Sequence, residues 1–177
     1  MNPNDPTPSP LIDSGAQTLI LPPSASSSDQ ENFSVLSPLV PADLRPHFAS
    51  VYDYCRLIDD LADAQGVGEA AQHRALSLLE LARQELRLGA AGTSHLPVFK
   101  ALGITIRERN LPLTPFEDLI LAFEQDQRIT RYETWDQLLD YCSRSANPVG
   151  RIILMLDGHT PENQPDLFRL SDNICTA

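Results

Sequence analysis

The feature that most limits the fold of this 177-residue chain is the helical spacing of its apolar residues, from about residue 41 to the end. Within 69–88, for example, Leu76, Leu79, Ala82 and Leu86 fall on one helix face. No segment alternates apolar and polar residues as a half-buried strand does, and no internal repeat is visible. A hydrophobic content of 42% is ordinary for a globular protein. The pattern therefore predicts an all-α fold.

Glycine and proline residues divide this pattern into separate helices. The predicted ranges are 41–64, 69–88, 94–109, a helix from 114, another from 134 that breaks or kinks at Asn147-Pro148, its continuation over 152–156, and a last helix from 165. Gly66 and Gly89 are interpreted as helix stops. Thr114 to Glu117 and Thr134 to Gln137 both have the form of a capping box. The last helix reaches Ala177 without a stop signal, so we expect a truncated fold.

Composition divides the chain into two parts and excludes several classes of function. Residues 1–29 are rich in Pro, Ser and Thr and are predicted to be a disordered tail, and residues 30–177 form the helical domain. The net charge of −11, with no cluster of cations, argues against nucleic-acid binding. The first basic residue is Arg45, which disfavours a secretory signal or a transit peptide. No apolar run approaches the roughly 20 residues of a membrane span.

The cysteines agree with an intracellular protein. Cys55, Cys142 and Cys175 are widely spaced and include no CxxC pair, which is typical of a reducing compartment rather than of a disulfide framework or a zinc site. We expect a cytoplasmic protein, which an apolar substrate could still bring to the periphery of the inner membrane.

Four charged side chains crowd the end of the first predicted helix. At 100° per residue, Arg56, Asp59, Asp60 and Asp63 fall within about 100° of arc, and most of the remaining surface of this helix is apolar. Aspartate is a poor helix former, and the charges of Asp59 and Asp63 repel at i,i+4. Negative charge in the last turn also meets the negative end of the helix dipole.

Two interpretations account for this acidic stripe. A solvated stripe on a surface helix is common in acidic proteins. A divalent cation is the alternative, because Mg²⁺ prefers one or two carboxylates together with waters and substrate phosphates. Arg56, one turn earlier, could contact the same phosphate as a planar donor. The apolar surroundings and this arginine favour binding of a metal–diphosphate complex.

The stretch from Tyr52 to Asp63 resembles the first aspartate-rich motif of the squalene/phytoene synthase family. Four further segments share the resemblance: residues 31–35, which read ENFSV, residues 39–41, which read LVP, residues 132–135, which read YETW, and residues 138–150, which read LLDYCSRSANPVG. The first and the last of these most resemble the hydroxysqualene synthase branch of bacterial hopanoid synthesis. The resemblance covers about residues 30–177. It implies the N-terminal portion of an isoprenoid synthase (class I terpenoid synthase) helical bundle.

The resemblance also implies roles for individual residues. Asp59 and Asp63, with Asp60 between them, match magnesium-binding carboxylates, and Arg56 matches an arginine that contacts diphosphate. The other matched residues are Tyr52 and Tyr141, which line the prenyl and diphosphate pocket, Asp126, which faces the metal site, and Phe33, which lines the apolar pocket. Asp59, Asp63 and Tyr52 would be catalytic. Two simpler interpretations stay open, because Tyr141 could be a core residue and Asp126 a surface charge.

The implied activity is that of a head-to-head prenyl transferase. Mg²⁺ would assist ionisation of presqualene diphosphate, and water would capture the cation to give hydroxysqualene. One alternative is the condensation of two farnesyl diphosphates to presqualene diphosphate or squalene. Another is a non-catalytic truncated helical fragment, because the family's second aspartate-rich motif would fall beyond Ala177.

Overall fold

The computed structural model describes residues 11–12, 19–20, 40–63 and 65–177. Its first elements are two short strands, β1 (Leu11–Ile12) and β2 (Leu19–Ile20), which pair antiparallel with Leu11 opposite Ile20. This pair was not predicted, and it falls inside the stretch expected to be a disordered tail. The remainder of that tail lies outside the described residues.

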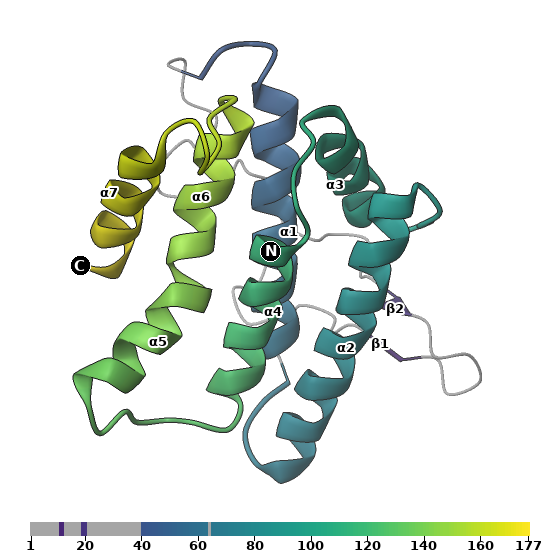
Figure 1. Cartoon of the computed structure of the whole chain (residues 1–177). Helices are drawn as coiled ribbons and strands as arrows, with labels where there is room; N and C mark the ends of the chain where they lie inside the picture. The colour runs from purple at the N-terminus through teal and green to yellow at the C-terminus, as the bar shows by residue number, and fades with distance from the viewer. Residues whose placement is uncertain (1–10, 13–18, 21–39, 64) are drawn as a thin grey trace, which may run out of the picture.

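Helices make up the rest of the described chain. They are α1 (Arg45–Asp63), α2 (Glu69–Ala91), α3 (Pro97–Glu108), α4 (Thr114–Asp126), α5 (Trp135–Ser145), α6 (Asn147–Leu156) and α7 (Pro165–Thr176). Figure 1 shows α1 in the middle of the bundle with α4 in front of it, α2 and α3 on one side, and α5, α6 and α7 on the other. The all-α prediction is confirmed. None of the described helices is both long and apolar enough to cross a membrane.

The core forms around one side of α1. Tyr54, Ile58 and Leu61 lie on this side and are fully buried. The Tyr54 ring meets Phe99 of α3 and Phe116 of α4 edge-on, with ring centroids 6.1 and 5.6 Å apart. Its hydroxyl donates a hydrogen bond of 2.8 Å to the Phe116 carbonyl oxygen, so no polar atom of this buried ring is left unsatisfied. Burial raises the pKa of Tyr54 well above its ordinary value.

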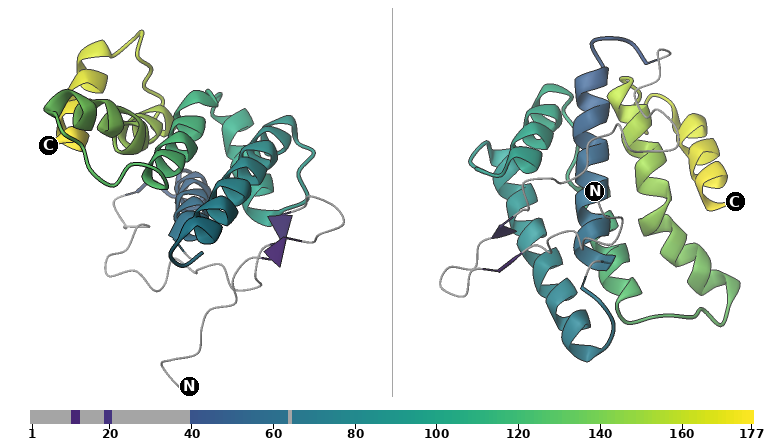
Figure 2. Two further views of the ribbon diagram at one scale, coloured as in Figure 1. Left: turned by 90° about the horizontal axis from the view of Figure 1, so that it is seen from below. Right: turned by 180° about the vertical axis from the view of Figure 1, so that it is seen from behind.

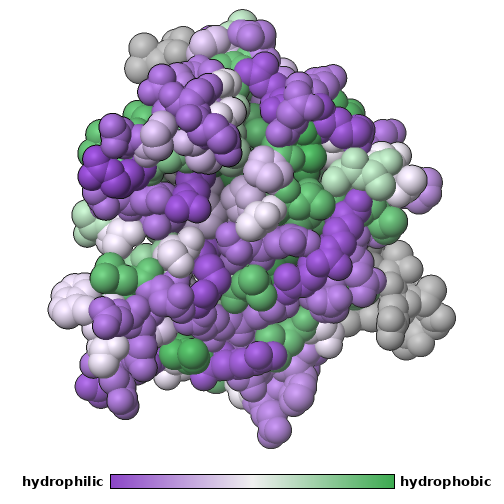
Figure 3. Space-filling view, viewed as in Figure 1, coloured by the Kyte–Doolittle hydropathy of each residue, from purple (hydrophilic) through white to green (hydrophobic). Residues whose placement is uncertain are grey.

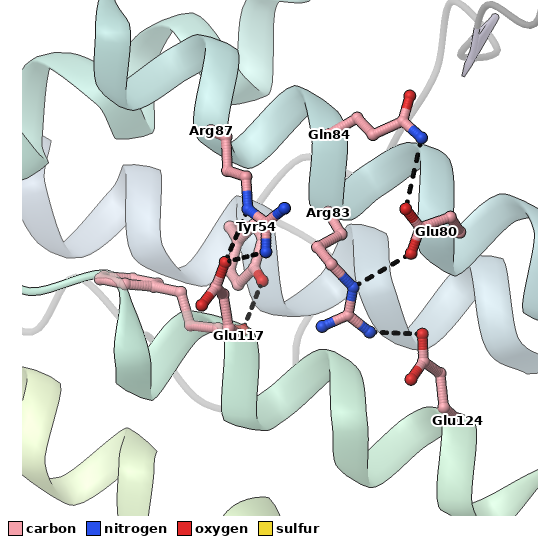
Figure 4. A network of polar contacts seen from close by, with 8 residues as sticks. Tyr54, Glu80, Arg83, Gln84, Arg87, Glu117 and Glu124 are labelled. Atoms are coloured by element: carbon pink, nitrogen blue, oxygen red, sulfur yellow. Dashed lines mark hydrogen bonds and ion pairs between the residues drawn. The ribbon is translucent and has the colours of Figure 1, made fainter.

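A polar network fastens α2 to α4 above this core. Arg83 of α2 bonds to Glu80 on its own helix and to Glu124 of α4 (Figure 4). One turn further along α2, Arg87 donates a hydrogen bond of 2.9 Å to Glu117 of α4. The Arg83 side chain is only 13% exposed, so its ion pairs are less screened by solvent than ordinary surface pairs. The network fixes the position of α4, the helix that carries Asp126.

The two glycines where α2 crosses α3 are required by close packing. A Cβ atom on Gly103 of α3 would lie 1.9 Å from the Gly89 carbonyl oxygen, and a Cβ on Gly89 would lie 2.3 Å from the Phe99 carbonyl oxygen. The interpretation of Gly89 as a helix stop is therefore wrong. The helix continues to Ala91 and ends at Gly92, whose φ of 81° is the left-handed conformation that glycine adopts most readily.

Two predicted helix starts and one predicted cap differ from the structure. The first helix starts at Arg45 rather than at residue 41, which still leaves Pro46 in its first turn. The third starts at Pro97 rather than at 94, because the Ser94 side chain instead accepts a hydrogen bond from the Leu96 amide. The capping box predicted at Thr114 is absent. The N-cap is Leu113, so Thr114 is already helical, and Glu117 pairs with Arg87 instead.

The capping box at Thr134, the break near Asn147 and the start of the last helix are confirmed, but α6 begins at Asn147 rather than at residue 152. Thr134 and Gln137 form a reciprocal capping box at the start of α5. The chain breaks after Ser145, and α6 begins at Asn147 with proline in its first turn. The last helix begins at Pro165 as predicted.

Replacement of Thr134 by alanine should loosen α5 locally. None of the residues of α5 is fully buried, so packing contributes little and the cap carries an unusual share of its stability. We expect the opening free energy of α5 to fall by about 1 kcal/mol, read as faster amide hydrogen exchange in its first two turns. Thr130→Ala, an exposed threonine in the preceding loop, is the control and should leave this exchange unchanged.

Candidate functional site

The acidic stripe occupies the side of α1 that faces away from the core. Arg56 donates a hydrogen bond of 2.8 Å to the Asp59 carboxylate and one of 3.4 Å to Asp60. The three side chains are between 35% and 46% exposed, and Asp63 is exposed. The predicted convergence of Arg56 with Asp59 and Asp60 is therefore present, and the arginine partly neutralises both carboxylates. Tyr52 lies half-buried one turn before Arg56.

Cys55 borders this stripe on the apolar side of α1. Burial, together with the negative charge of Asp59, raises the pKa of the thiol to about 12. The thiolate is the reactive form of cysteine, so this side chain is inert at neutral pH. The structure thus agrees with its interpretation as a packing residue, and all three cysteines are free.

A second cluster lies where α4 ends beside α5. The Tyr141 hydroxyl donates a hydrogen bond of 2.7 Å to Asp126. Burial raises the pKa of Asp126, the bond from Tyr141 lowers it, and the charge of Asp63 raises it again. Asp63 of α1 therefore lies near enough to Asp126 of α4 for its charge to act on that carboxylate. Tyr141 and Asp126 are half-buried partners, neither core nor plain surface residues.

Three further residues complete this cluster and were not assigned roles from the sequence. The Tyr132 ring lies against Tyr141, with centroids 5.3 Å apart. Gln125 donates a hydrogen bond of 2.9 Å to the Tyr132 hydroxyl and accepts one of 3.0 Å from Arg144. The available signals were the helical spacing of Tyr141 and Arg144 and the position of Gln125 next to Asp126. A cavity of about 680 Å³ between α4 and α5 is lined by Gln125, Tyr132 and Arg144, and by none of the stripe residues.

Replacing Asp126 with asparagine should lower the pKa of Tyr141. Burial, the hydrogen bond to Asp126 and the charge of Asp126 together raise this pKa from 10.0 to about 12. Asparagine removes the charge and leaves burial, so we expect a value between these two. Absorbance titration of the phenolate would measure it, in a Tyr132→Phe background that removes the neighbouring signal.

The sign of the linked stability effect follows from the same pKa. The pKa of Tyr141 is higher in the folded chain than in the unfolded chain. The contribution of Tyr141 to the free energy of unfolding is therefore fully present below pH 10.0 and is lost as the pH rises through about 12. An unchanged alkaline unfolding profile in Asp126→Asn would contradict the assigned contact.

The carboxylates are suited to one side of a magnesium site. Within the described residues, no group of three or more His, Cys, Asp or Glu side chains is arranged to hold a metal ion by itself. Mg²⁺ does not require such a group, because it commonly takes one or two carboxylates and fills its remaining positions with waters and phosphate oxygens. Asp59 and Asp63 supply oxygen donors of the right kind, and Asp126 adds charge from α4. Phe33 lies outside the described residues.

Comparison with known proteins identifies the family. The family model described as squalene/phytoene synthase matches residues 27–177. The hydroxysqualene synthase of Zymomonas mobilis is 36% identical over 150 residues, which cover 83% of this chain and 47% of that protein. The hydroxysqualene synthase of Sinorhizobium fredii is 33% identical, with 84% and 47% covered.

A solved structure agrees with these matches. The squalene synthase HpnC from Alicyclobacillus acidocaldarius is 44% identical, with a TM-score of 0.73 over 84% of this chain and 54% of that one. The chain thus spans about half the length of the relatives it matches. Its helical fold, its acidic motif on α1 and the family match over residues 27–177 lead to one conclusion: the chain belongs to the squalene/phytoene synthase family.

Proposed function

We propose that this chain provides the first acidic motif and half of the prenyl-binding wall of a hydroxysqualene synthase. The substrate is presqualene diphosphate. Its carbon–oxygen bond breaks, diphosphate leaves with the electron pair, and the oxygen of a water molecule bonds to the cation and releases a proton. The observation that supports this proposal best is the Arg56–Asp59–Asp60 cluster at the end of α1, on a chain that resembles two hydroxysqualene synthases.

Each side chain has a distinct task in this proposal. Asp59 and Asp63 hold Mg²⁺, which when bound supplies Lewis-acid stabilisation of the departing diphosphate. Asp60 shares Arg56 with Asp59, and this contact orients the guanidinium toward the phosphate oxygens. Asp126 keeps the Tyr141 hydroxyl pointed at the acidic region.

Condensation of two farnesyl diphosphates is the second candidate. The solved relative is described as a squalene synthase, and it is 44% identical to this chain. The condensation requires the same metal-held diphosphate, so the acidic motif serves both reactions. The condensation forms carbon–carbon bonds between two farnesyl units and releases one diphosphate, whereas the first candidate adds water to a substrate that is already joined. Product analysis with each substrate therefore separates them.

A covalent chimera tests the proposal. Residues 27–177 would replace the matched 150-residue region of the Zymomonas mobilis protein, which restores a full-length synthase. We expect Mg²⁺-dependent conversion of presqualene diphosphate to hydroxysqualene. Presqualene diphosphate as the main product from farnesyl diphosphate, formed with release of one diphosphate and one proton, would favour the second candidate. A folded chimera that lacks turnover with either substrate would contradict both.

A further inference from the structure

The cavity of about 680 Å³ between α4 and α5 is large enough for a ligand of its own. Pockets that bind small molecules usually have volumes of about 300 to 1,000 Å³. Seen from below in Figure 2, the loop between α4 and α5 spans the distance between the two helices at this end of the molecule. No residue of the acidic stripe lines the cavity, so it is distinct from the diphosphate site proposed above.

Three arginines from different parts of the fold line this cavity. Arg128 follows the end of α4, Arg131 lies in the loop, and Arg144 belongs to α5. Arg144 is already engaged, because it pairs with Asp140 on its own helix and donates a hydrogen bond of 3.0 Å to Gln125. Within the part of the chain that the structure describes, neither Arg128 nor Arg131 makes an ion pair. Two guanidinium groups are therefore left for a ligand.

The acidic residues of the lining neutralise these two groups only in part. Glu124 is paired with Arg83 of α2. Asp140 is paired with Arg144. Of the carboxylates that line the cavity, this leaves Glu133 against two guanidinium groups, which is a local excess of one positive charge. In a chain of net charge −11, such an excess favours an anionic ligand at this position.

The hydroxyl of Tyr132 adds a neutral donor to the two guanidinium groups. The side-chain oxygen of Gln125 accepts the hydrogen bond from Arg144, so its amide nitrogen is the group that meets the Tyr132 hydroxyl, at 2.9 Å. Since the nitrogen donates in this bond, the hydroxyl oxygen accepts and keeps its own proton for another acceptor. A ligand oxygen in the cavity can be that acceptor.

Two apolar side chains give the cavity a hydrophobic wall. Leu121 and Ile129 line it and are 41% and 42% exposed. At 100° per residue, Leu121 falls on the face of α4 opposite the buried Phe116 and Ile120, so it does not belong to the core. Figure 3 shows hydrophobic spots of this kind within a largely hydrophilic surface over α4 and α5. A ligand with an apolar part would remove these side chains from water.

We propose that this cavity binds a phosphate monoester that carries an apolar chain, and that it does so without a metal ion. A guanidinium group matches phosphate in a bidentate geometry. A carboxylate has two oxygens, which one guanidinium can occupy, whereas a phosphate monoester offers three acceptor oxygens. Three oxygens are enough for Arg128, Arg131 and the Tyr132 hydroxyl, and the chain would lie against the apolar wall. The proposal goes beyond the proposed function and does not depend on it.

Titration of the full chain with monomeric decyl phosphate in the presence of EDTA tests this site. EDTA removes the divalent cations that binding at the acidic stripe would require. Trp135 is the single tryptophan of the sequence, and it lines a cavity of about 210 Å³ that shares Tyr132 and Glu133 with the larger one, so its fluorescence reports on the site. We expect a saturable change, with decyl phosphate binding about tenfold or more tightly than inorganic phosphate.

Variants separate the polar and apolar parts of the site. Arg128→Gln and Arg131→Gln should each weaken binding of decyl phosphate about tenfold, because each removes a charge-assisted contact. Ile129→Ser should reduce the preference for decyl phosphate and leave the affinity for inorganic phosphate unchanged. Lys100→Gln is the charge-matched control, because Lys100 is exposed on α3, across α1 from α5 in Figure 1, and it should leave binding unchanged.

Two sources of such a phosphate can be distinguished. Phosphatidic acid in phosphatidylcholine vesicles presents the group at a membrane surface, and farnesyl phosphate presents it in solution. Sedimentation with these vesicles, but not with phosphatidylcholine alone, would assign a lipid headgroup, provided that Arg131→Gln abolishes it. Saturable binding of farnesyl phosphate without sedimentation would assign a soluble ligand.

Two results would overturn the proposal. One is the lack of saturable binding of decyl phosphate to the unmodified chain. The other is equal affinity in the parent and in both arginine variants. Turnover of the chimera is measured with Mg²⁺ and depends on the acidic stripe, so this test and the test of function fail independently.

Discussion

Turnover of the chimera should fall on the order of 100-fold or more when Asp63 is replaced by asparagine, with Asp59→Asn giving a similar loss. Asparagine keeps the size of the side chain and removes the charge that would hold a divalent cation. The effect should appear in kcat/KM for presqualene diphosphate, and saturating Mg²⁺ should restore only part of it. Near-normal turnover of either variant at limiting Mg²⁺ would show that these carboxylates do not take part in the reaction.

A charge-matched control separates catalysis from global charge. Asp43 is exposed just before α1, about 30 Å from Asp63 along the helix axis at 1.5 Å per residue. Asp43→Asn makes the same change in net charge and should leave turnover unchanged. The thermal midpoint gives a second readout, because Asp63→Asn removes a like-charge i,i+4 pair with Asp59. We therefore expect this variant to be as stable as the parent or slightly more stable.

Gly103→Ala is expected to be the most destabilising of the conservative substitutions considered. Its new methyl group would lie 1.9 Å from the Gly89 carbonyl oxygen, and the obstacle is helix backbone that cannot rotate away. Overpacking of this kind costs about 3 kcal/mol or more, because α2 and α3 must separate. Urea denaturation of the full chain would measure this as a lower midpoint.

Gly150→Ala provides the matched control for this prediction. The added methyl group would approach the Ser171 Oγ atom at 2.4 Å and the Cys175 Sγ atom at 2.7 Å, and both are ends of side chains that can change rotamer. Alanine also gains about 1 kcal/mol in helix propensity over glycine, which offsets part of the crowding. We expect a net loss below about 1 kcal/mol. Equal losses at both glycines would mean that α2 and α3 can adjust as easily as α6 and α7.

The helices were predictable because their signals are local. Proline in the first turn of α7 and the Thr134–Gln137 box both act within one turn, and both are confirmed. Gly89 is a position where local signals give the wrong prediction. Its sequence surroundings are those of a helix stop, but its role is set by Phe99 and Gly103 on a different helix. The failed capping box at Thr114 has the same origin, because Glu117 is engaged by Arg87 of α2.

The site was predictable only in part, for a similar reason. The stripe on α1 follows from spacing along one helix, and the Arg56 bonds to Asp59 and Asp60 confirm it. The Tyr132–Tyr141 contact and the position of Gln125 depend on how α5 packs against α4, which no local pattern encodes. Resemblance to the family pointed to Tyr141 and Asp126, and the structure adds the hydrogen bond that joins them.

The hydrogen bonds from Arg56 to the carboxylates of Asp59 and Asp60 have an electrostatic consequence. Three aspartates and one arginine leave the stripe with a formal charge of −2, which a single divalent cation balances without excess. A monovalent cation leaves half of that charge in place, so sodium or potassium should compete weakly. When phosphate oxygens arrive with the metal, the guanidinium can exchange a carboxylate for a phosphate, so one positive charge stays beside the negative charge that the diphosphate adds.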